Sequence, residues 1–278
     1  HRDIWGVGFR PNQTSCGFYM DLASSPLHSI SAVDELADHP WPSPDLWDYS
    51  GIGRQTESLS EFWIGAHSRG IFEISWFLRG FAEFMTDLVC ERDLAVALMD
   101  RVQEYLFERT RRVLEAGKGK IDMVEYNDDV GGQDALLIAP GLWREHIKPR
   151  MAEFVRLCRT HGAVVRYHSC GSVRAIIPDL IEIGVDVLNP VQAIAAGMDP
   201  YELKKEYGGL ITLDGCVDTQ QLLPNATADE VRWEVARLVE IVGNGGGLIL
   251  APSHVLQPDV PVENVVALYE TALGRNLV

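Results

Sequence analysis

The pentapeptide Tyr167-His168-Ser169-Cys170-Gly171 places a histidine and a cysteine two residues apart, directly after the largely apolar run Ala163-Val164-Val165-Arg166. Where a strand ends, two such side chains can turn toward one point above a sheet. Imidazole nitrogen and thiolate sulfur are ligands that zinc prefers. The tripeptide alone is a weak signal, because a buried cysteine often serves only as a small apolar side chain. A zinc site therefore requires further ligands nearby.

Polar residues follow the other predicted strands in the same way. They are Glu125, Asn127, Asp128 and Asp129 after one strand, Asn189 and Gln192 after another, Asp214, Cys216 and Asp218 after a third, and Ser253, His254 and Gln257 after the last. If the strands form a barrel, their carboxyl ends meet at one mouth. We therefore expect these side chains to converge on one site.

A catalytic zinc site uses three protein ligands and keeps one position open. His168 and Cys170 supply two, and position along the chain favours His254 as the third, with Cys216 or Glu125 as alternatives. Asp128 or Asp129 can orient a substrate or carry protons, and His254 is a further catalytic candidate. The residues expected to contact the substrate are Glu125, Asn127, Asn189, Gln192 and Asp218.

Structural explanations compete with some of these roles. An aspartate just after a strand often caps the next helix, and Asp129 and Asp218 fit that role as well as a chemical one. Asp214-Gly215 is also typical of a turn. Cys216 is more simply explained as packing than as a metal ligand.

The elements that must position these residues alternate along the chain. Residues 1–60 are predicted to be an irregular segment packed on a larger body. Helices are predicted at 81–89, 93–116, 140–160, 173–183, 200–206, 228–242 and 262–273, and strands at 121–126, 163–167, 185–188, 210–213 and 247–250. This alternation is typical of parallel strands joined by helical crossovers.

Both an open doubly wound sheet and a (β/α)₈ barrel satisfy that pattern. The open sheet usually carries a glycine-rich turn after a strand, whereas Gly243-Asn244-Gly245-Gly246-Gly247 precedes one. The clustering of polar residues at strand ends favours the barrel, as one domain over residues 1–278. Because the chain opens with His1, we expect an N-terminal portion of the natural protein to precede it.

The composition limits the class of protein. A formal net charge of −16 over 278 residues argues against a nucleic-acid partner. No apolar stretch approaches the roughly 20 residues of a membrane helix. The scattered cysteines do not form a disulfide framework, and they indicate a reduced, cytoplasmic protein. These cysteines are Cys16, Cys90, Cys158, Cys170 and Cys216.

With these features the chain resembles the uroporphyrinogen decarboxylase superfamily, and within it the corrinoid-linked methyltransferases. The resemblance rests on the ordered segments Tyr126-Asn127-Asp128-Asp129, His168-Ser169-Cys170-Gly171, 184–190, 213–218 and 258–264. It implies a (β/α)₈ barrel. It also implies zinc bound by an H-x-C pair and a later cysteine, with the methyl group passing to or from a corrinoid on a separate protein.

His168 and Cys170 match the first two ligands of that family pattern, whereas His254 stands where the later cysteine is expected. The resemblance therefore implies a zinc-dependent methyltransferase acting on a small substrate, such as a methyl ether, with a corrinoid protein as partner. The decarboxylases carry a histidine at the position of His254 but lack the H-x-C pair and use no metal. A metal-free decarboxylase, in which Asp128 or Asp129 stabilises a protonated pyrrole, is the first alternative. A non-catalytic barrel that binds a tetrapyrrole or corrinoid partner is the second.

Overall fold

The structure, a computed structural model, describes residues 1–14 and 17–276, so that Cys16 lies outside the described residues. Packing divides the chain into two compact units. Unit 1 comprises His1–Thr14, Phe18–Asp129 and Ile138–Arg166, and unit 2 comprises Val130–Leu137 together with the residues from Tyr167 onward. None of the described helices is both long and apolar enough to span a membrane.

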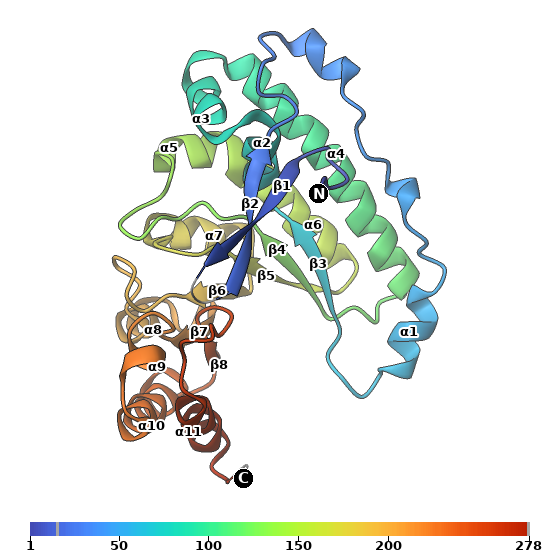
Figure 1. The fold of residues 1–278 in the computed structure, drawn as a ribbon. Coiled ribbons are helices and arrows are strands. Elements are labelled where there is room, and N and C mark those ends of the chain that lie inside the picture. Colours follow the sequence, from blue (N-terminus) through green and yellow to red (C-terminus); the bar gives the residue numbers. More distant parts are fainter. Residues whose placement is uncertain (15–16, 277–278) are drawn as a thin grey trace. The chain divides into compact units, whose positions relative to one another are not determined.

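Strands and helices alternate along most of the chain (Figure 1). The strands are β1 (Gly8–Thr14), β2 (Gly17–Ser24), β3 (Gly65–Arg69), β4 (Met123–Asn127), β5 (Val164–His168), β6 (Val187–Val191), β7 (Thr212–Val217) and β8 (Leu248–Pro252). The α-helices are α1 (Ile52–Ser58), α2 (Ile71–Arg79), α3 (Phe81–Cys90), α4 (Arg92–Gly117), α5 (Pro140–Leu142), α6 (Lys148–Thr160), α7 (Ile177–Ile183), α8 (Pro200–Tyr207), α9 (Leu222–Asn225), α10 (Ala228–Arg237) and α11 (Val262–Leu273). Short 3₁₀ or π turns lie at Val33–Asp38, Pro44–Leu46, Trp143–Ile147, Arg174–Ile176 and Leu238–Val242.

The strands from β3 to β8 belong to a six-stranded sheet in which their order follows the sequence. The registers of β3 with β4, of β6 with β7 and of β7 with β8 are parallel. The predicted α/β class, with parallel strands and helical crossovers, is confirmed. Sequential neighbours are also the strand order of a (β/α)₈ barrel. Closure of the eight-stranded barrel stays a prediction.

The sequence prediction was wrong in several places. It missed β3 and α2, because Gly65-Ala66-His67-Ser68-Arg69 lacks the β-branched and aromatic residues that signal a strand. It treated residues 1–60 as irregular, whereas β1 and β2 pair there in a two-stranded sheet. It ended the strand before β6 does, because Pro190 has no N–H, yet β6 continues through it to Val191.

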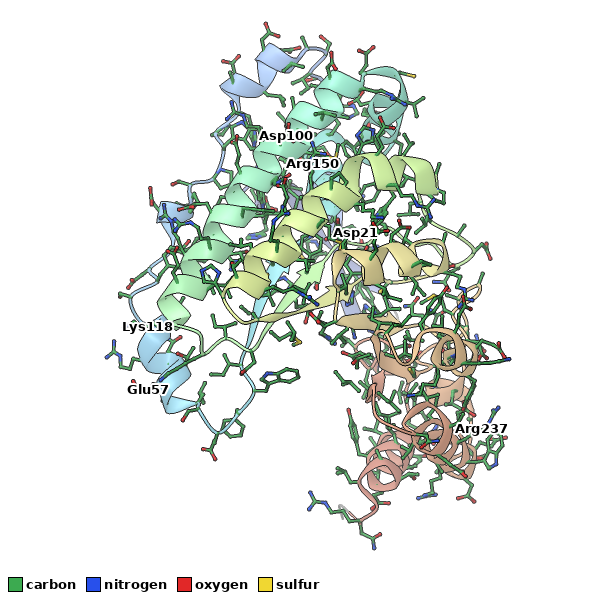
Figure 2. All side chains as sticks on the ribbon, turned by 180° about the vertical axis from the view of Figure 1, so that it is seen from behind. Asp21, Glu57, Asp100, Lys118, Arg150 and Arg237 are labelled. Atoms are coloured by element: carbon green, nitrogen blue, oxygen red, sulfur yellow. The ribbon has the colours of Figure 1, made fainter. Side chains whose placement is uncertain are left out.

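In unit 1 the long helix α4 packs against α2, α3 and α6. The interface is apolar, with Leu98 and Met99 of α4 and Phe154 of α6 fully buried. At its edge Arg150 of α6 forms an ion pair with Asp100 of α4, and Figure 2 shows the two side chains meeting across these helices. Burial of apolar side chains of this size contributes about 1.5–3 kcal/mol each, so packing rather than the ion pair dominates the stability of this interface.

The N-terminus of α2 is fixed by the end of β4. The hydroxyl of Tyr126 accepts a hydrogen bond from the backbone N–H of Ile71 at 3.1 Å. The carboxylate of Asp128 accepts from the N–H groups of Phe72 at 3.2 Å and Glu73 at 2.8 Å. The first N–H groups of a helix have no partner within the helix, so these two side chains supply partners from outside it.

In unit 2 the helices are tied to one another and to their own caps. The fully buried side chain of Asn264 on α11 donates to the carbonyls of Leu223 and Ala226 at 2.9 and 2.8 Å. Thr227 caps α10 through its hydroxyl, and Glu230 returns the bond to the Thr227 backbone, which forms a capping box. These contacts hold α9, α10 and α11 together beside one another (Figure 1).

Candidate metal centre

His168 ends β5, and Cys170 follows it after one residue. Both side chains are half-buried, whereas Ser169 between them is fully buried. Cys170 Sγ and His168 Nε2 lie 3.8 Å apart. In tetrahedral zinc, with Zn–S about 2.3 Å and Zn–N about 2.0–2.1 Å, the two ligand atoms lie roughly 3.6 Å apart. The predicted convergence of this pair is therefore present in the structure, at a separation that suits zinc.

Asn189 holds the ring of His168. Its side-chain oxygen lies 2.6 Å from Nδ1 of His168. Because an amide oxygen only accepts hydrogen bonds, Nδ1 is the donor in this contact, and Nε2 is the ring nitrogen that faces Cys170. Asn189 is itself buried, and its backbone carbonyl accepts from the N–H of Ser169 at 2.9 Å. A metal-binding histidine usually donates its second N–H to such an oxygen.

The turn after Cys170 is held by close backbone contacts. Gly171 has a φ of +80°, and its N–H donates to the side-chain oxygen of Gln192 at 2.7 Å. A Cβ on Gly171 would lie 2.4 Å from the carbonyl oxygen of Gly132, and one on Gly131 would lie 2.4 Å from that of Cys170. Glycine at 131 and 171 thus lets residues 131–132 approach the turn closely, which fixes the backbone beside Cys170.

Asp129 is a further group able to bind a metal at this turn. In the part of the chain that the structure describes, one group of His, Cys, Asp or Glu side chains is arranged to hold a metal ion, and it consists of Asp129, His168 and Cys170. The N–H of Val130, one peptide bond after Asp129, donates to Ser169 Oγ at 3.0 Å. Nitrogen, sulfur and carboxylate oxygen are all zinc ligands, so these residues fit the metal that the sequence predicted.

The other candidate ligands lie in different surroundings. His254 is exposed and is not part of that group. Cys216 is buried in β7 at a φ of +73°. Burial, aided by the charge of Asp214, raises the pKa of the Cys216 thiol far above its ordinary value, so it is a neutral thiol. The carboxylate of Glu125 forms an ion pair with Arg166 and lies 3.9 Å from Nδ1 of His67.

Two of the predicted catalytic and substrate-contacting residues, Asp128 and Asp218, hold the start of a helix. Asp128 is fully buried as the cap of α2, and burial raises the pKa of its carboxyl to about 8. Asp218 accepts from the N–H groups of Gln220, Gln221 and Leu222, which makes it the cap before α9. The buried side-chain oxygen of Asn127 has no hydrogen-bond partner among the described residues. The chemical roles proposed for these residues stay predictions.

Sequence reasoning gave no role to Ser169 and assigned Asn189 and Gln192 to the substrate alone. In the structure Asn189 orients His168, and Gln192 holds the turn at Gly171. A signal for Asn189 was present. It lies in β6, the strand next to β5 in the sheet, and a metal-binding histidine needs a hydrogen-bond partner for its second ring nitrogen. No comparable signal distinguished Ser169 from an ordinary loop serine.

The chain belongs to the uroporphyrinogen decarboxylase family, whose profile, described as uroporphyrinogen decarboxylase (URO-D), matches residues 52–274. The fold agrees, because a solved methyltransferase from Methanosarcina mazei superposes with a TM-score of 0.67 at 20% identity over 98% of this chain and 76% of that one. The predicted superfamily is thereby confirmed.

Relatives of two kinds are similar in sequence. The methylcobamide:CoM methyltransferase MtaA of Methanosarcina barkeri is 28% identical over 185 residues, which are 66% of this chain and 50% of that protein. The uroporphyrinogen decarboxylase of Thermus thermophilus is 28% identical over 173 residues, 61% of this chain and 46% of that protein. The chain thus spans about half the length of the curated relatives it matches. The resemblance to the corrinoid-linked methyltransferase branch is supported, and both relatives are enzymes.

Proposed function

We propose that this protein is a zinc-dependent methyltransferase that moves a methyl group between a small substrate and a corrinoid carried by a partner protein. The observation that carries the proposal is the His168–Cys170 pair, with 3.8 Å between Nε2 and Sγ and with Nδ1 of the histidine engaged by Asn189. A cofactor-free decarboxylase needs no thiol at this position. The likeness to MtaA of M. barkeri supports the corrinoid partner.

In this proposal His168, Cys170 and Asp129 hold the zinc. His254, the third ligand favoured by the sequence, stays a candidate beside Asp129. Zinc bound there supplies a Lewis acid for an oxygen or sulfur of the methyl donor or acceptor. Asn189 accepts a hydrogen bond from Nδ1 of His168, which orients the ring so that Nε2 is the nitrogen presented to the metal. Gln192 holds the N–H of Gly171 and with it the position of the cysteine backbone.

The ligand set also bears on the substrate. Cys170 supplies a single thiolate, because it is the one cysteine in the group of metal-capable side chains found among the described residues. A set with one thiolate leaves more Lewis acidity on zinc than a set with two, and this favours polarising an ether or hydroxyl oxygen. We therefore propose a methyl ether as the donor class, as in an O-demethylase, rather than a thiol acceptor.

The test is a methyl-transfer assay with the zinc-loaded protein, a cobalt(I) corrinoid protein and a set of methyl ethers, followed by the absorbance change of methylcobalamin formation. We expect turnover that falls at least about 100-fold in the Cys170→Ala variant, because loss of a bound metal removes its Lewis acidity. Cys90→Ala, at an exposed cysteine in α3, is the matched control and should retain full activity.

The same preparations are offered uroporphyrinogen, because the decarboxylase of T. thermophilus is as similar to this chain as the methyltransferase is. We expect no coproporphyrinogen from either zinc-loaded or metal-free protein. Decarboxylation by metal-free protein would replace our proposal with the decarboxylase alternative. Equal methyl transfer with and without zinc would refute the role of the metal but leave the proposed methyltransferase activity in place.

A further inference from the structure

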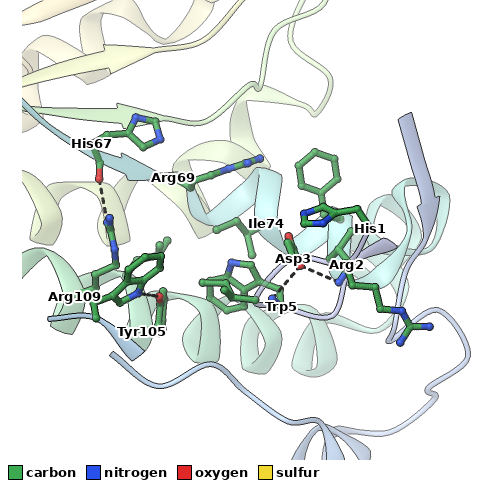
Figure 3. Close-up of a pocket in the computed structure, with 14 residues that line it drawn as sticks. His1, Arg2, Asp3, Trp5, His67, Arg69, Ile74, Tyr105 and Arg109 are labelled. Carbon is green, nitrogen blue, oxygen red and sulfur yellow. Dashed lines mark hydrogen bonds between the residues drawn. The ribbon is translucent and has the colours of Figure 1, made fainter. Parts of the chain in front are cut away.

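A cavity of about 410 Å³ lies in unit 1, lined by α2, α4, β3, Trp47 and the first residues of the chain (Figure 3). Its volume falls within the range of small-molecule sites, about 300–1,000 Å³. It is lined entirely by residues of unit 1, and neither His168 nor Cys170 contributes to it. The proposed zinc chemistry therefore does not account for this cavity.

Aromatic side chains form one wall of the cavity. Trp5 and Tyr105, both buried, meet edge to face with their ring centroids 4.9 Å apart. Trp47 donates from its indole N–H to the hydroxyl of Tyr105 at 2.8 Å. Asp3 holds Trp5 in place, because its carboxylate accepts from the N–H groups of Trp5 and Val7, each at 2.9 Å. A wall fixed in this way suits a flat ring, which packs against aromatic edges and faces.

Arg109 on α4 adds a positive charge to the cavity. Its guanidinium donates to the backbone carbonyl of His67 at 3.0 Å and lies 5.6 Å from the ring centroid of Trp47. Figure 3 shows Arg109 and Tyr105 projecting from the same helix into the lining. A guanidinium has five N–H donors, so this single hydrogen bond leaves donors for a ligand.

Within the described residues Arg109 differs from the neighbouring arginines of α4 and β3, because it has no carboxylate partner. Arg69, which also lines the cavity, is paired with Glu73 at 2.8 Å, and Arg111 and Arg112 on the next turn of α4 are paired with Glu108. Arg109 makes no such ion pair within the described residues, although the chain has 40 Asp and Glu against 24 Lys and Arg. Where carboxylates are in excess, an arginine left without one beside a cavity points to an anionic ligand.

We infer that this cavity binds a small planar organic carboxylate, with its ring against Trp5, Tyr105 and Trp47 and its carboxylate on Arg109. The ring supplies apolar contact with the aromatic wall, and the guanidinium forms a charge-assisted, fork-shaped pair with the carboxylate. The site is separate from the proposed function, so the methyl-transfer assay neither supports nor contradicts it.

The test is a titration of the protein with benzoate, followed by tryptophan fluorescence, because Trp5 and Trp47 line the cavity, and by calorimetry. We expect saturable binding that weakens at least about 10-fold in Arg109→Gln, which loses a charge-assisted bond but can still donate to His67. Arg109→Lys should retain part of the affinity. Arg101→Gln, at an exposed arginine of α4 outside the cavity, is the matched control and should bind as the natural protein does.

Two further ligands test the chemistry on the unaltered protein, so that the inference does not depend on how a variant folds. Benzamide has the ring without the charge, and cyclohexanecarboxylate has the charge without the flat ring. Both should bind at least about 10-fold more weakly than benzoate. The inference is overturned if benzoate shows no saturable binding up to about 10 mM, if either analogue binds as tightly, or if Arg109→Gln leaves the affinity unchanged.

Discussion

Replacing Cys170 with alanine is expected to weaken zinc binding by at least about 100-fold. Loss of a second-sphere partner already costs about 10- to 100-fold in metal affinity, and Cys170 would be a direct ligand and the sole thiolate. The remaining His168 and Asp129 hold zinc more weakly, because their set has lost the softest donor. Competition with a chromophoric chelator at pH 7 measures the affinity of each variant.

Two further variants, Cys158→Ala and Asn189→Ala, distinguish the loss of a ligand from other effects of substitution. Cys158→Ala removes a buried thiol that packs in α6, so it should bind zinc with unchanged affinity. Asn189→Ala keeps every proposed ligand but removes the partner of His168 Nδ1, so its affinity should fall about 10- to 100-fold, between the natural protein and Cys170→Ala. Equal affinities in Cys170→Ala and Cys158→Ala would show that Cys170 is not a ligand.

Replacing Asp128 with alanine is expected to lower the free energy of unfolding by about 3 kcal/mol. The substitution leaves the N–H groups of the buried Phe72 and the half-buried Glu73 without their acceptor, and each loss at a fully buried group costs about 1–3 kcal/mol. Urea denaturation followed by circular dichroism measures the change. Because Asp128 is fully buried against α2, we expect the loss to appear in stability before it appears in chemistry.

Asp128→Asn is the informative companion variant. It keeps one side-chain oxygen for a backbone N–H, so the loss should be about 1 kcal/mol. Asp229→Ala, at an aspartate whose side chain is 94% exposed, is the control and should change stability by less than about 0.5 kcal/mol. An Asp128→Ala protein as stable as the natural one would contradict the capping role and favour the predicted catalytic role of Asp128.

The pattern of the sequence predicted the repeating units of the fold and the metal pair for physical reasons. Short apolar or β-branched runs open β4 to β8, and such residues are favoured in strands because they pack well on a pleated, half-buried surface. His168 and Cys170 could be found because few other residue types bind zinc and because they follow one such run. The pattern did not predict β3, because Gly65-Ala66-His67-Ser68-Arg69 has no such run.

Asp128 and Asp129 have the same side chain, and alternation along β4, rather than residue type, distinguishes their roles. Burial alternates along β4, where Tyr126 is buried and Asn127 half-buried, and it continues with Asp128 buried and Asp129 half-buried. Alternation of side chains along a strand therefore separates the cap of α2 from the candidate ligand. No such signal exists for His254, because it lies in the loop after β8, where side chains do not alternate as they do along a strand.

X-ray absorption at the zinc edge of the zinc-loaded protein tests the proposed centre most directly, because it counts sulfur atoms around the metal. We predict one equivalent of zinc with a single sulfur at about 2.3 Å and nitrogen or oxygen atoms at about 2.0–2.1 Å. The sulfur contribution should vanish in Cys170→Ala and persist in Cys158→Ala. A zinc shell without sulfur, a shell with two sulfurs, or failure to bind an equivalent of zinc would contradict the proposal.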